Sequence, residues 1–361
     1  MSEVAGFGVY LHVPFCRRRC DYCAFATWTD RLDLAQRYLS ACRRQVVEAV
    51  GAGMAPVTSV FVGGGTPTLV PAAELLAVLA AVPLVPGAEV TVEANPDDVT
   101  PELLGAYADG GVNRLSLGVQ SMVPSVLDSL GRTHDVANVH RAAEAAHEVG
   151  LPFNVDLIYG AAGETIDEWS TTIDQALTLE PEHVSAYGLT VEAGTPLAAD
   201  TARHPDDDDQ ADKYMLATDR LAAAGYRWYE ISNWAKPGHE CRHNQLYWSQ
   251  GDYLGVGCAA HSHHSGRRWW NLRTPERYVE AVEAGRSVEA GHESLDPDRR
   301  RFERWELALR TNEGVPADAF EPGSREYLRP LLRTAAGDPG QLTLTIPGRL
   351  LANEVAVHLR S

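Results

Sequence analysis

Residues 12–23 read HVPFCRRRCDYC, and this stretch decides the expected fold and chemistry of the chain. Cys16, Cys20 and Cys23 form a CxxxCxxC pattern directly after an apolar, strand-like run. Three thiolates on one short loop can hold three irons of a [4Fe-4S] cluster and leave the fourth iron open to a ligand. Structural zinc is the alternative, but it usually takes two separated ligand pairs, and no fourth ligand lies at such spacing here. The pattern therefore favours the cluster.

Short β-rich runs alternate with helical segments over the first half of the chain. The expected strands are Val9–Val13, Ser59–Gly63, Glu89–Glu93, Arg114–Val119, Phe153–Tyr159 and Val184–Leu189. The expected helices are Leu34–Ala49, Ala72–Ala81, Pro101–Asp109, Ala137–Val149 and Ile166–Leu179. Six such units in a row predict a parallel sheet with helical crossovers, either open and doubly wound or barrel-like.

Glycine and polar residues follow the ends of these expected strands. They are Cys16, Gly63–Thr66, Glu93–Asn95, Gln120–Ser121, Asp156 with Tyr159–Gly160, and Thr190. In both kinds of parallel sheet, ligands bind at the carboxyl ends of the strands. We therefore expect these groups to share one site.

The alternation ends after Thr195. A polar loop (201–210), a helix (210–224), an aromatic strand (226–234) and a Gly/His/Trp-rich region (237–271) are expected to follow. The last region is expected to be helical and to end in a Leu/Thr alternation with a turn at 342–350. These shifts in pattern predict three parts. They are a core barrel (1–200), a barrel extension (201–286) and a small C-terminal α+β domain (287–361).

Composition and charge narrow the classes of function. The chain has 361 residues and a net charge of −18, which argues against a nucleic-acid partner, because phosphate binding needs a basic face. No apolar run reaches the ~18–20 residues of a membrane helix, and the opening MSEVAGFGVY lacks the regions of a signal peptide. We therefore expect a cytoplasmic protein without an integral membrane segment. Cys42, Cys241 and Cys258 are expected only to pack.

The cysteine loop, together with GGGTPT at residues 63–68, resembles the radical S-adenosylmethionine superfamily. The resemblance implies an α/β fold, a partial (β/α)6 TIM-type barrel with a C-terminal α+β appendage. It also implies that S-adenosylmethionine chelates the open iron through its amino and carboxylate groups. An electron from the cluster would then cleave the sulfonium bond and give methionine and a 5′-deoxyadenosyl radical. The protein would position the cofactor and exclude water and oxygen.

Four further segments resemble the oxygen-independent coproporphyrinogen III oxidase family, and the similarity extends over essentially the whole chain. They are YLHVPFC at 10–16, EANP at 93–96, RLSLGVQS at 114–121 and NVDLIYG at 154–160. The resemblance implies S-adenosylmethionine contacts and no assigned catalytic residue. The implied contacts are Tyr10, Tyr22, Gly64, Gly65, Thr66, Glu93, Gln120, Arg132 and Asp156. Taken alone, each of these side chains is more often structural than a ligand contact.

The family has two arms, an oxidase that decarboxylates two propionates of coproporphyrinogen III and the heme chaperone HemW. The oxidase carries an additional cysteine where this chain has Phe25, and it has a substantial N-terminal extension where this chain has a few residues. HNQLYW at residues 243–248 is similar to the HNxxYW motif that is associated with heme binding in the chaperone. These features favour the chaperone, without coproporphyrinogen oxidase activity. The oxidase and a radical enzyme with another substrate are the alternatives.

His243 is the expected axial ligand to heme iron, because a neutral imidazole is a good ligand. Tyr247 and Trp248 would supply a flat apolar surface for the porphyrin, and Arg267 and Arg268 would meet the heme propionates. The alternative is a histidine buried in an aromatic loop. The expected cofactors are a [4Fe-4S] cluster, S-adenosylmethionine and heme. The expected partners are heme-acceptor proteins, and the resemblance allows a homodimer and peripheral membrane association.

Overall fold

The computed structural model describes residues 6–335 and 337–360, so the first five residues of the short N-terminal segment lie outside the described part. Six parallel strands form the centre of a large sheet, in the order in which they occur in the chain. They are β1 (Phe7–Val13), β2 (Val57–Gly64), β3 (Leu84–Ala94), β4 (Arg114–Gln120), β5 (Phe153–Tyr159) and β6 (His183–Gly188). This sequential order, without a reversal at the centre, is that of a partial barrel and not of a doubly wound sheet.

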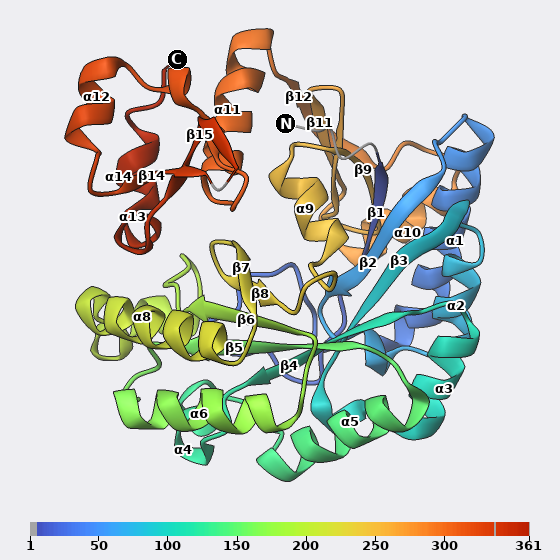
Figure 1. The fold of residues 1–361 in the computed structure, drawn as a ribbon. Helices are drawn as coiled ribbons and strands as arrows, with labels where there is room; N and C mark the ends of the chain where they lie inside the picture. The colour runs from blue at the N-terminus through green and yellow to red at the C-terminus, as the bar shows by residue number, and fades with distance from the viewer. Residues whose placement is uncertain (1–5, 336, 361) are drawn as a thin grey trace.

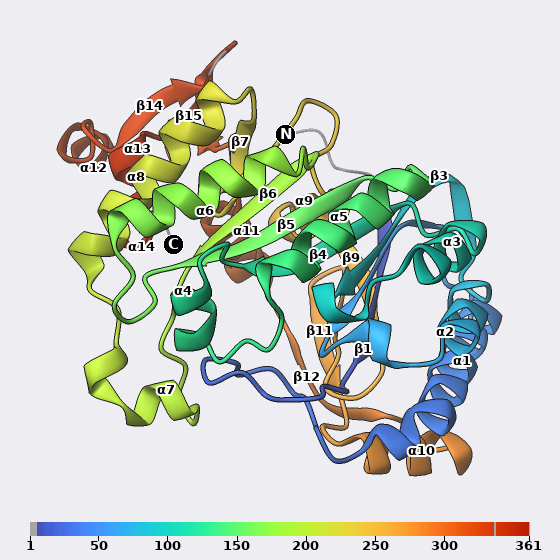
Figure 2. The same ribbon diagram turned by 90° about the horizontal axis from the view of Figure 1, so that it is seen from below.

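Two short helices, α4 (Pro124–Ser129) and α7 (Pro196–Ala199), lie beyond the carboxyl ends of the strands (Figure 2), where Ser129 donates to the Ala162 carbonyl and the Leu197 N–H donates to the Asp21 carbonyl. The other connecting helices lie on the outer face of the curved sheet (Figures 1 and 2). They are α1 (Ala35–Gly51), α2 (Ala72–Leu79), α3 (Pro101–Asp109), α5 (Val136–Val149), α6 (Ile166–Thr178) and α8 (Asp207–Ala223). Tyr38, Tyr107 and Trp169 of these helices are fully buried in the core between helices and sheet. At the start of α6, Thr165 and Glu168 form a reciprocal capping box, which satisfies two backbone N–H groups.

The sheet continues beyond the six parallel strands on both sides. On one side β8 (Asn233–Ala235) and β7 (Arg227–Glu230) follow β6. On the other side β9 (Asp252–Val256) runs parallel to β1, and β10 (His261–His264), β11 (Arg267–Asn271) and β12 (Glu289–Ser294) follow in antiparallel order. The prediction of one strand over 226–234 was therefore wrong. Aromatic residues lie on both sides of the turn, and the turn contains no Gly or Pro that would mark it in the sequence. In the turn, the Glu230 carboxylate accepts a hydrogen bond from the Ser232 N–H.

Two further boundaries differ from expectation. The acidic run predicted as loop belongs partly to α8, which begins at Asp207 because Asp206 caps it and carboxylates are favourable near a helix N-terminus. The Leu/Thr alternation ends earlier than expected. It forms β15 (Asp338–Leu344) and is followed by the short helix α13 (Ile346–Leu350), whose first turn is capped by Thr345.

One helix, α9 (Arg242–Trp248), lies on the inner face of the sheet, opposite the outer helices (Figure 1). A side chain at Gly8 of β1 would collide with Leu246 and His243, so glycine lets the helix approach the strand. Helix α10 (Pro275–Glu283) lies outside, next to α1. The HNQLYW motif therefore closes the inside of the barrel near the start of the strands.

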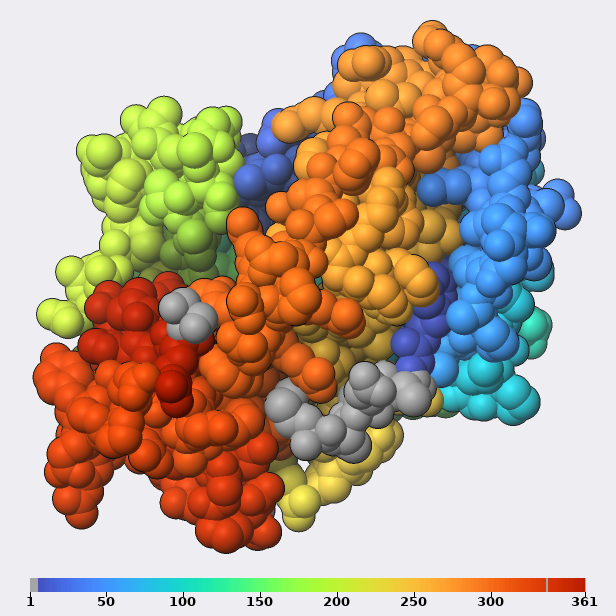
Figure 3. Space-filling model, turned by 90° about the horizontal axis from the view of Figure 1, so that it is seen from above, coloured from blue at the N-terminus to red at the C-terminus, as the bar shows by residue number. Residues whose placement is uncertain are grey.

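The C-terminal part forms a lobe with its own core (Figures 1 and 3). It contains α11 (Pro297–Leu309), β13 (Val315–Pro316), α12 (Pro322–Tyr327), β14 (Leu332–Ala335), β15, α13 and α14 (Ala352–Ala356). Leu309, Phe320, Leu344 and Val355 are buried in this core. Although β12 lies within the range 287–361 expected for the C-terminal domain, it pairs with the large sheet. The boundaries of the three expected parts stay a prediction. None of the described helices is long and apolar enough to cross a membrane.

Candidate functional site

A cavity of about 650 Å³ opens at the carboxyl ends of the six parallel strands. Each of the six strands, or the segment that follows it, contributes residues to its wall, as expected for the carboxyl ends of parallel strands. Of the residues expected at the strand ends, Gly63, Ser121, Tyr159 and Gly160 are not among the lining residues. Eleven residues singled out in the sequence line it together. They are Cys16, Cys20, Tyr22, Cys23, Gly64, Gly65, Thr66, Glu93, Gln120, Arg132 and Asp156.

The cysteine loop after β1 folds back on itself and is fixed by backbone hydrogen bonds. The N–H of Cys16 donates to the Trp28 carbonyl at 3.1 Å, and the N–H of Trp28 donates to the Pro14 carbonyl at 2.7 Å. The imidazole of His12 reaches the Ala26 carbonyl at 2.9 Å and ties the loop to β1. All three loop cysteines are free thiols on the cavity wall. Burial raises the pKa of the Cys16 and Cys23 thiols.

Two donors lie against the cysteine sulfurs. The Arg132 Nη1 is 3.4 Å from Cys20 Sγ, and the Thr66 hydroxyl is 3.9 Å from Cys16 Sγ. Within 6–335 and 337–360, no three His, Cys, Asp or Glu side chains converge as a single metal ion requires. A [4Fe-4S] cluster has a different requirement, because each cysteine binds a separate iron. The free thiols, the donors and the cavity fit such a cluster.

The glycine run after β2 packs directly against the cysteine loop. A Cβ at Gly65 would lie 2.5 Å from the Phe15 carbonyl oxygen, so only glycine fits there. The Gly65 N–H donates to the Val13 carbonyl at 2.8 Å, and the Thr66 N–H donates to the Phe15 carbonyl at 2.7 Å. At the end of β4, Gln120 has a φ of +64°, a strained conformation for a residue other than glycine. Strained backbone is common at ligand sites.

Two partly buried acids, Glu93 and Asp156, face the cavity. Burial, together with the charge of Asp156, raises the pKa of Glu93 to about 8, although the Gly64 N–H donates to its carboxylate at 3.0 Å. Burial also raises the pKa of Asp156, and hydrogen bonds from its neighbours oppose this shift. Two acids near one another favour a ligand with positive charge or hydrogen-bond donors. Because Arg132 lines the same cavity, the cavity suits a ligand that carries both an ammonium and a carboxylate.

Several lining residues were not singled out from the sequence as ligand contacts, among them Asp98, Ser116 and Tyr187. Asp98 accepts from Arg17 at 2.7 Å and from Thr68 at 3.2 Å, and so links the loops after three strands. Its position just after the third strand was the available signal. Ser116 and Tyr187 lie within strands, where the sequence alone does not distinguish a ligand contact from a core residue.

Two of the predicted site residues, Tyr10 and His243, are not part of the cavity wall. The Tyr10 hydroxyl hydrogen-bonds His12 Nδ1 at 3.1 Å. His243 belongs to α9, and its side chain is fully buried against β2. Its Nδ1 lies 3.0 Å from the Ser59 hydroxyl, and its Nε2 lies 2.9 Å from the Tyr247 hydroxyl. Burial lowers the pKa of His243 to about 3, so the imidazole is neutral. Both ring nitrogens therefore have partners in this conformation.

The arginines expected near heme propionates are paired with carboxylates. Arg267 contacts Glu289 at 2.7 Å, and Arg268 contacts Glu293 and Glu303, each at 2.9 Å. These arginines would have to exchange partners before they could bind a propionate. The remaining cysteines are free and buried in the core, as expected. They are Cys42, Cys241 and Cys258.

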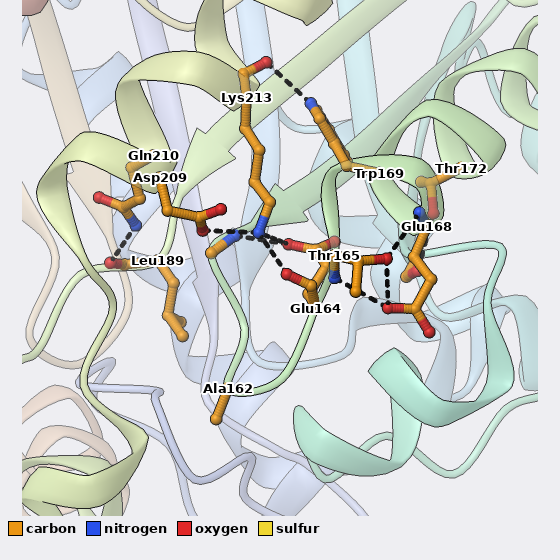
Figure 4. Close-up of polar contacts among 12 residues, drawn as sticks. Ala162, Glu164, Thr165, Glu168, Trp169, Thr172, Leu189, Asp209, Gln210 and Lys213 are labelled. Atoms are coloured by element: carbon orange, nitrogen blue, oxygen red, sulfur yellow. Dashed lines mark hydrogen bonds and ion pairs between the residues drawn. The ribbon is translucent and has the colours of Figure 1, made fainter.

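A buried ion pair between Lys213 and Glu164 holds two segments near the cavity in place (Figure 4). Lys213 Nζ of α8 donates to the Glu164 carbonyl at 2.7 Å and contacts the carboxylates of Glu164 and Asp209 at 3.2 and 2.6 Å. The same Glu164 carboxylate accepts from the Gly160 N–H at 2.7 Å, and Gln210 donates to the Leu189 carbonyl at 2.9 Å. These contacts fix the segments after β5 and β6, and Leu189 of the second segment lines the cavity.

Comparison with known proteins identifies relatives of the whole chain. A model of the radical SAM superfamily matches residues 10–176. The heme chaperone HemW of Mycobacterium tuberculosis is 42% identical, covering 97% of this chain and 93% of the relative. HemW of Escherichia coli is 35% identical, covering 95% and 96%. The solved structure of coproporphyrinogen III oxidase (HemN) from Escherichia coli has a TM-score of 0.84 at 22% identity, covering 98% of this chain and 89% of that one, and shows the same fold.

Proposed function

Since the chain belongs to the HemW heme chaperone family within the radical SAM superfamily, we propose that it binds heme and delivers it to acceptor proteins. The observation that carries this proposal is the identity of 42% over 97% of the chain to a heme chaperone. The acceptors are then heme proteins, including respiratory ones. Location in the cytoplasm, peripheral membrane contact and a homodimer are further parts of the proposal.

The proposal includes a [4Fe-4S] cluster on Cys16, Cys20 and Cys23 with S-adenosylmethionine beside it. Support comes from the three free thiols on one wall of the cavity and from the Arg132 donor near Cys20. When bound, the cluster supplies one electron for cleavage of the sulfonium bond. In the cavity, Glu93 offers an acceptor for the ammonium group of the cofactor. Gly64, Gly65, Thr66 and Gln120 offer polar groups near it.

His243 remains the proposed axial ligand to heme iron. Its neutral imidazole has the protonation state that ligation needs. Both ring nitrogens, however, are occupied by Ser59 and Tyr247. Heme binding through His243 therefore requires that one of these hydrogen bonds breaks and that the groups that cover the fully buried imidazole move. Coproporphyrinogen oxidation is the alternative activity, and for it the likeness to HemN supports the fold alone.

The test is an anaerobic heme titration of cluster-loaded protein, followed by Soret absorbance. Saturable, roughly stoichiometric binding is expected, with no decarboxylated product when coproporphyrinogen III and S-adenosylmethionine are supplied instead. His243→Ala should weaken heme binding and leave the cluster absorbance intact. His147→Ala is the matched control, because His147 lies on an outer helix, where its ring hydrogen-bonds the Leu179 carbonyl and packs against Phe153, away from His243. Product formation with turnover and unsaturable heme uptake would support the oxidase instead.

Cysteine variants test the cluster separately. Cys16→Ala should abolish the cluster absorbance of the reconstituted protein. Cys42→Ala is its control, because Cys42 is a free thiol buried in the core away from the cavity. An intact cluster in the Cys16 variant would refute the assignment of the ligands.

A further inference from the structure

A chain of hydrogen bonds runs through the inside of the barrel and ends on Asp156. Asp156 Oδ1 accepts from Asn154 Nδ2, and its Oδ2 accepts from the Ser116 hydroxyl, both at 2.7 Å. Asn154 Oδ1 lies 2.5 Å from His183 Nδ1, and His183 Nε2 lies 2.8 Å from the Tyr229 hydroxyl. Asp156 and Ser116 line the cavity, whereas the other three residues are buried outside its wall. The chain thus links the cavity to the interior of the sheet.

The chemistry of the partners fixes the direction of each hydrogen bond. Both oxygens of Asp156 accept hydrogen bonds here, so Asn154 turns its amide nitrogen toward Asp156 and its oxygen toward His183. His183 therefore carries its proton on Nδ1, and its bare Nε2 accepts from the Tyr229 hydroxyl. Burial, and to a lesser extent Arg114, lower the pKa of His183 well below its usual range. The imidazole is therefore neutral and has a single tautomer that satisfies both neighbours.

This arrangement leaves a defined acceptor at the cavity. Each oxygen of Asp156 receives one of these hydrogen bonds and keeps a free lone pair. The hydrogen bonds oppose the burial that raises the pKa of Asp156, so they favour the ionised form. A carboxylate with two free lone pairs can accept hydrogen bonds from two neighbouring hydroxyls. The ribose of S-adenosylmethionine carries such a pair.

We propose that His183 is a positioning residue for ribose recognition, because it holds Asn154 in the orientation that presents an ionised Asp156 to the cavity. Asn154 Oδ1 also accepts from the Ser185 hydroxyl at 3.3 Å, and its Nδ2 also donates to the Ser116 hydroxyl at 2.8 Å. Hydroxyl groups can donate as well as accept, so without the imidazole these two contacts still allow the Asn154 amide to turn by half a revolution and place its oxygen against the carboxylate. The two acceptors would then repel each other, and Asp156 would be a poorer partner for hydroxyl groups. This inference rests on the proposed function, since it requires S-adenosylmethionine in the cavity.

The test uses variants that separate the donor role of His183 from its bulk. His183→Leu removes both ring nitrogens, whereas His183→Asn keeps an N–H near the position of Nδ1. Tyr229→Phe removes only the hydroxyl that bonds His183 Nε2 and helps to hold the ring in place. This variant decides the question if the leucine variant does not fold. His147→Leu is the matched control, because it removes an imidazole that bonds only the Leu179 carbonyl.

The readout is the affinity of anaerobic, cluster-loaded protein for S-adenosylhomocysteine and for its 2′,3′-dideoxy analogue, measured by calorimetry. His183→Leu should weaken binding of the first ligand about 5- to 30-fold and leave binding of the analogue nearly unchanged. His183→Asn should retain most of the affinity, and Tyr229→Phe should show a smaller loss that is again confined to the ribose ligand.

An equal loss for both ligands, or no loss, would overturn the inference and leave His183 a structural residue. Failure of the proposed S-adenosylmethionine site, on which the inference rests, would look different, because the cluster-loaded wild-type protein would then bind neither ligand.

Discussion

The guanidinium of Arg132 lies 3.4 Å from the sulfur of Cys20, and its other terminal nitrogen donates to the Gly118 carbonyl at 3.1 Å. The second hydrogen bond anchors the side chain to β4, so the positive charge has a fixed place beside the proposed cluster. The guanidinium therefore contacts the sulfur of Cys20, whereas Arg19 hydrogen-bonds only the backbone carbonyl of Cys23.

Replacement of Arg132 should lower the reduction potential of the cluster. A nearby positive charge stabilises the reduced form, which carries one more negative charge, and hydrogen bonds to sulfur act in the same direction. Arg132→Met should therefore shift the midpoint to a more negative value in an anaerobic titration followed by electron paramagnetic resonance, and Arg132→Lys should shift it less. Arg220→Met, which removes an exposed contact with Asp174, is the control. An unchanged or more positive midpoint would contradict the assigned role.

Removal of the Tyr247 hydroxyl should increase the rate at which heme associates with His243. The hydroxyl lies 2.9 Å from Nε2 of His243 and must leave before that nitrogen can bind iron. Tyr247→Phe keeps the ring and removes this competition, so heme should associate about 5-fold faster, the equivalent of one net hydrogen bond. Stopped-flow absorbance measures the rate. A slower association would indicate that Tyr247 itself helps to hold the heme.

Disruption of the Lys213 ion pair should destabilise the barrel. Both Lys213 and Glu164 have fully buried side chains, so Lys213→Met leaves a buried carboxylate without its partner. The expected loss is about 3–5 kcal/mol in the free energy of unfolding, measured with urea. The double variant Lys213→Met/Glu164→Gln should recover part of it. Arg220→Met removes an exposed pair instead and should cost about 0–1 kcal/mol. Similar losses for the two single variants would refute the role of burial.

Glu230 should make stability depend on pH. Burial raises its pKa to about 8, above the value near 4.5 that it has when exposed. The stability that its protonated form contributes is complete below pH 4.5 and is lost as pH rises through about 8. Glu230→Gln should remove this loss, which is on the order of a few kcal/mol, and flatten the pH profile of unfolding over that window. An equally steep profile in the variant would show that other groups cause the dependence.

The sequence predicted the central sheet well because its signals are local. Each expected strand is an apolar run, and the polar residues just after these runs, such as Cys16 and Glu93, meet at one cavity because parallel strands end on one edge. The hairpin that contains Trp228 and Trp234 was missed. These two residues pair across the turn, and their aromatic alternation gives no sign of where the chain reverses.

The surroundings of His243 and His183 could not be predicted, since they depend on residues far away in the chain. His243 contacts Ser59, 184 positions earlier, and His183 contacts Tyr229, 46 positions later. A motif identifies the histidine but not whether its nitrogens are free. For His183 there was no motif at all, and only the packing of neighbouring strands brings it to Asn154.

The most direct test of the account is a heme transfer assay with the cluster-loaded chain under anaerobic conditions. The chain is loaded with one equivalent of heme and mixed with an apo-heme protein, while carbon dioxide release from added coproporphyrinogen III and S-adenosylmethionine is measured in parallel. The account predicts that heme moves to the acceptor and that no carbon dioxide is released. Steady release of carbon dioxide, with heme neither held nor transferred, would contradict it.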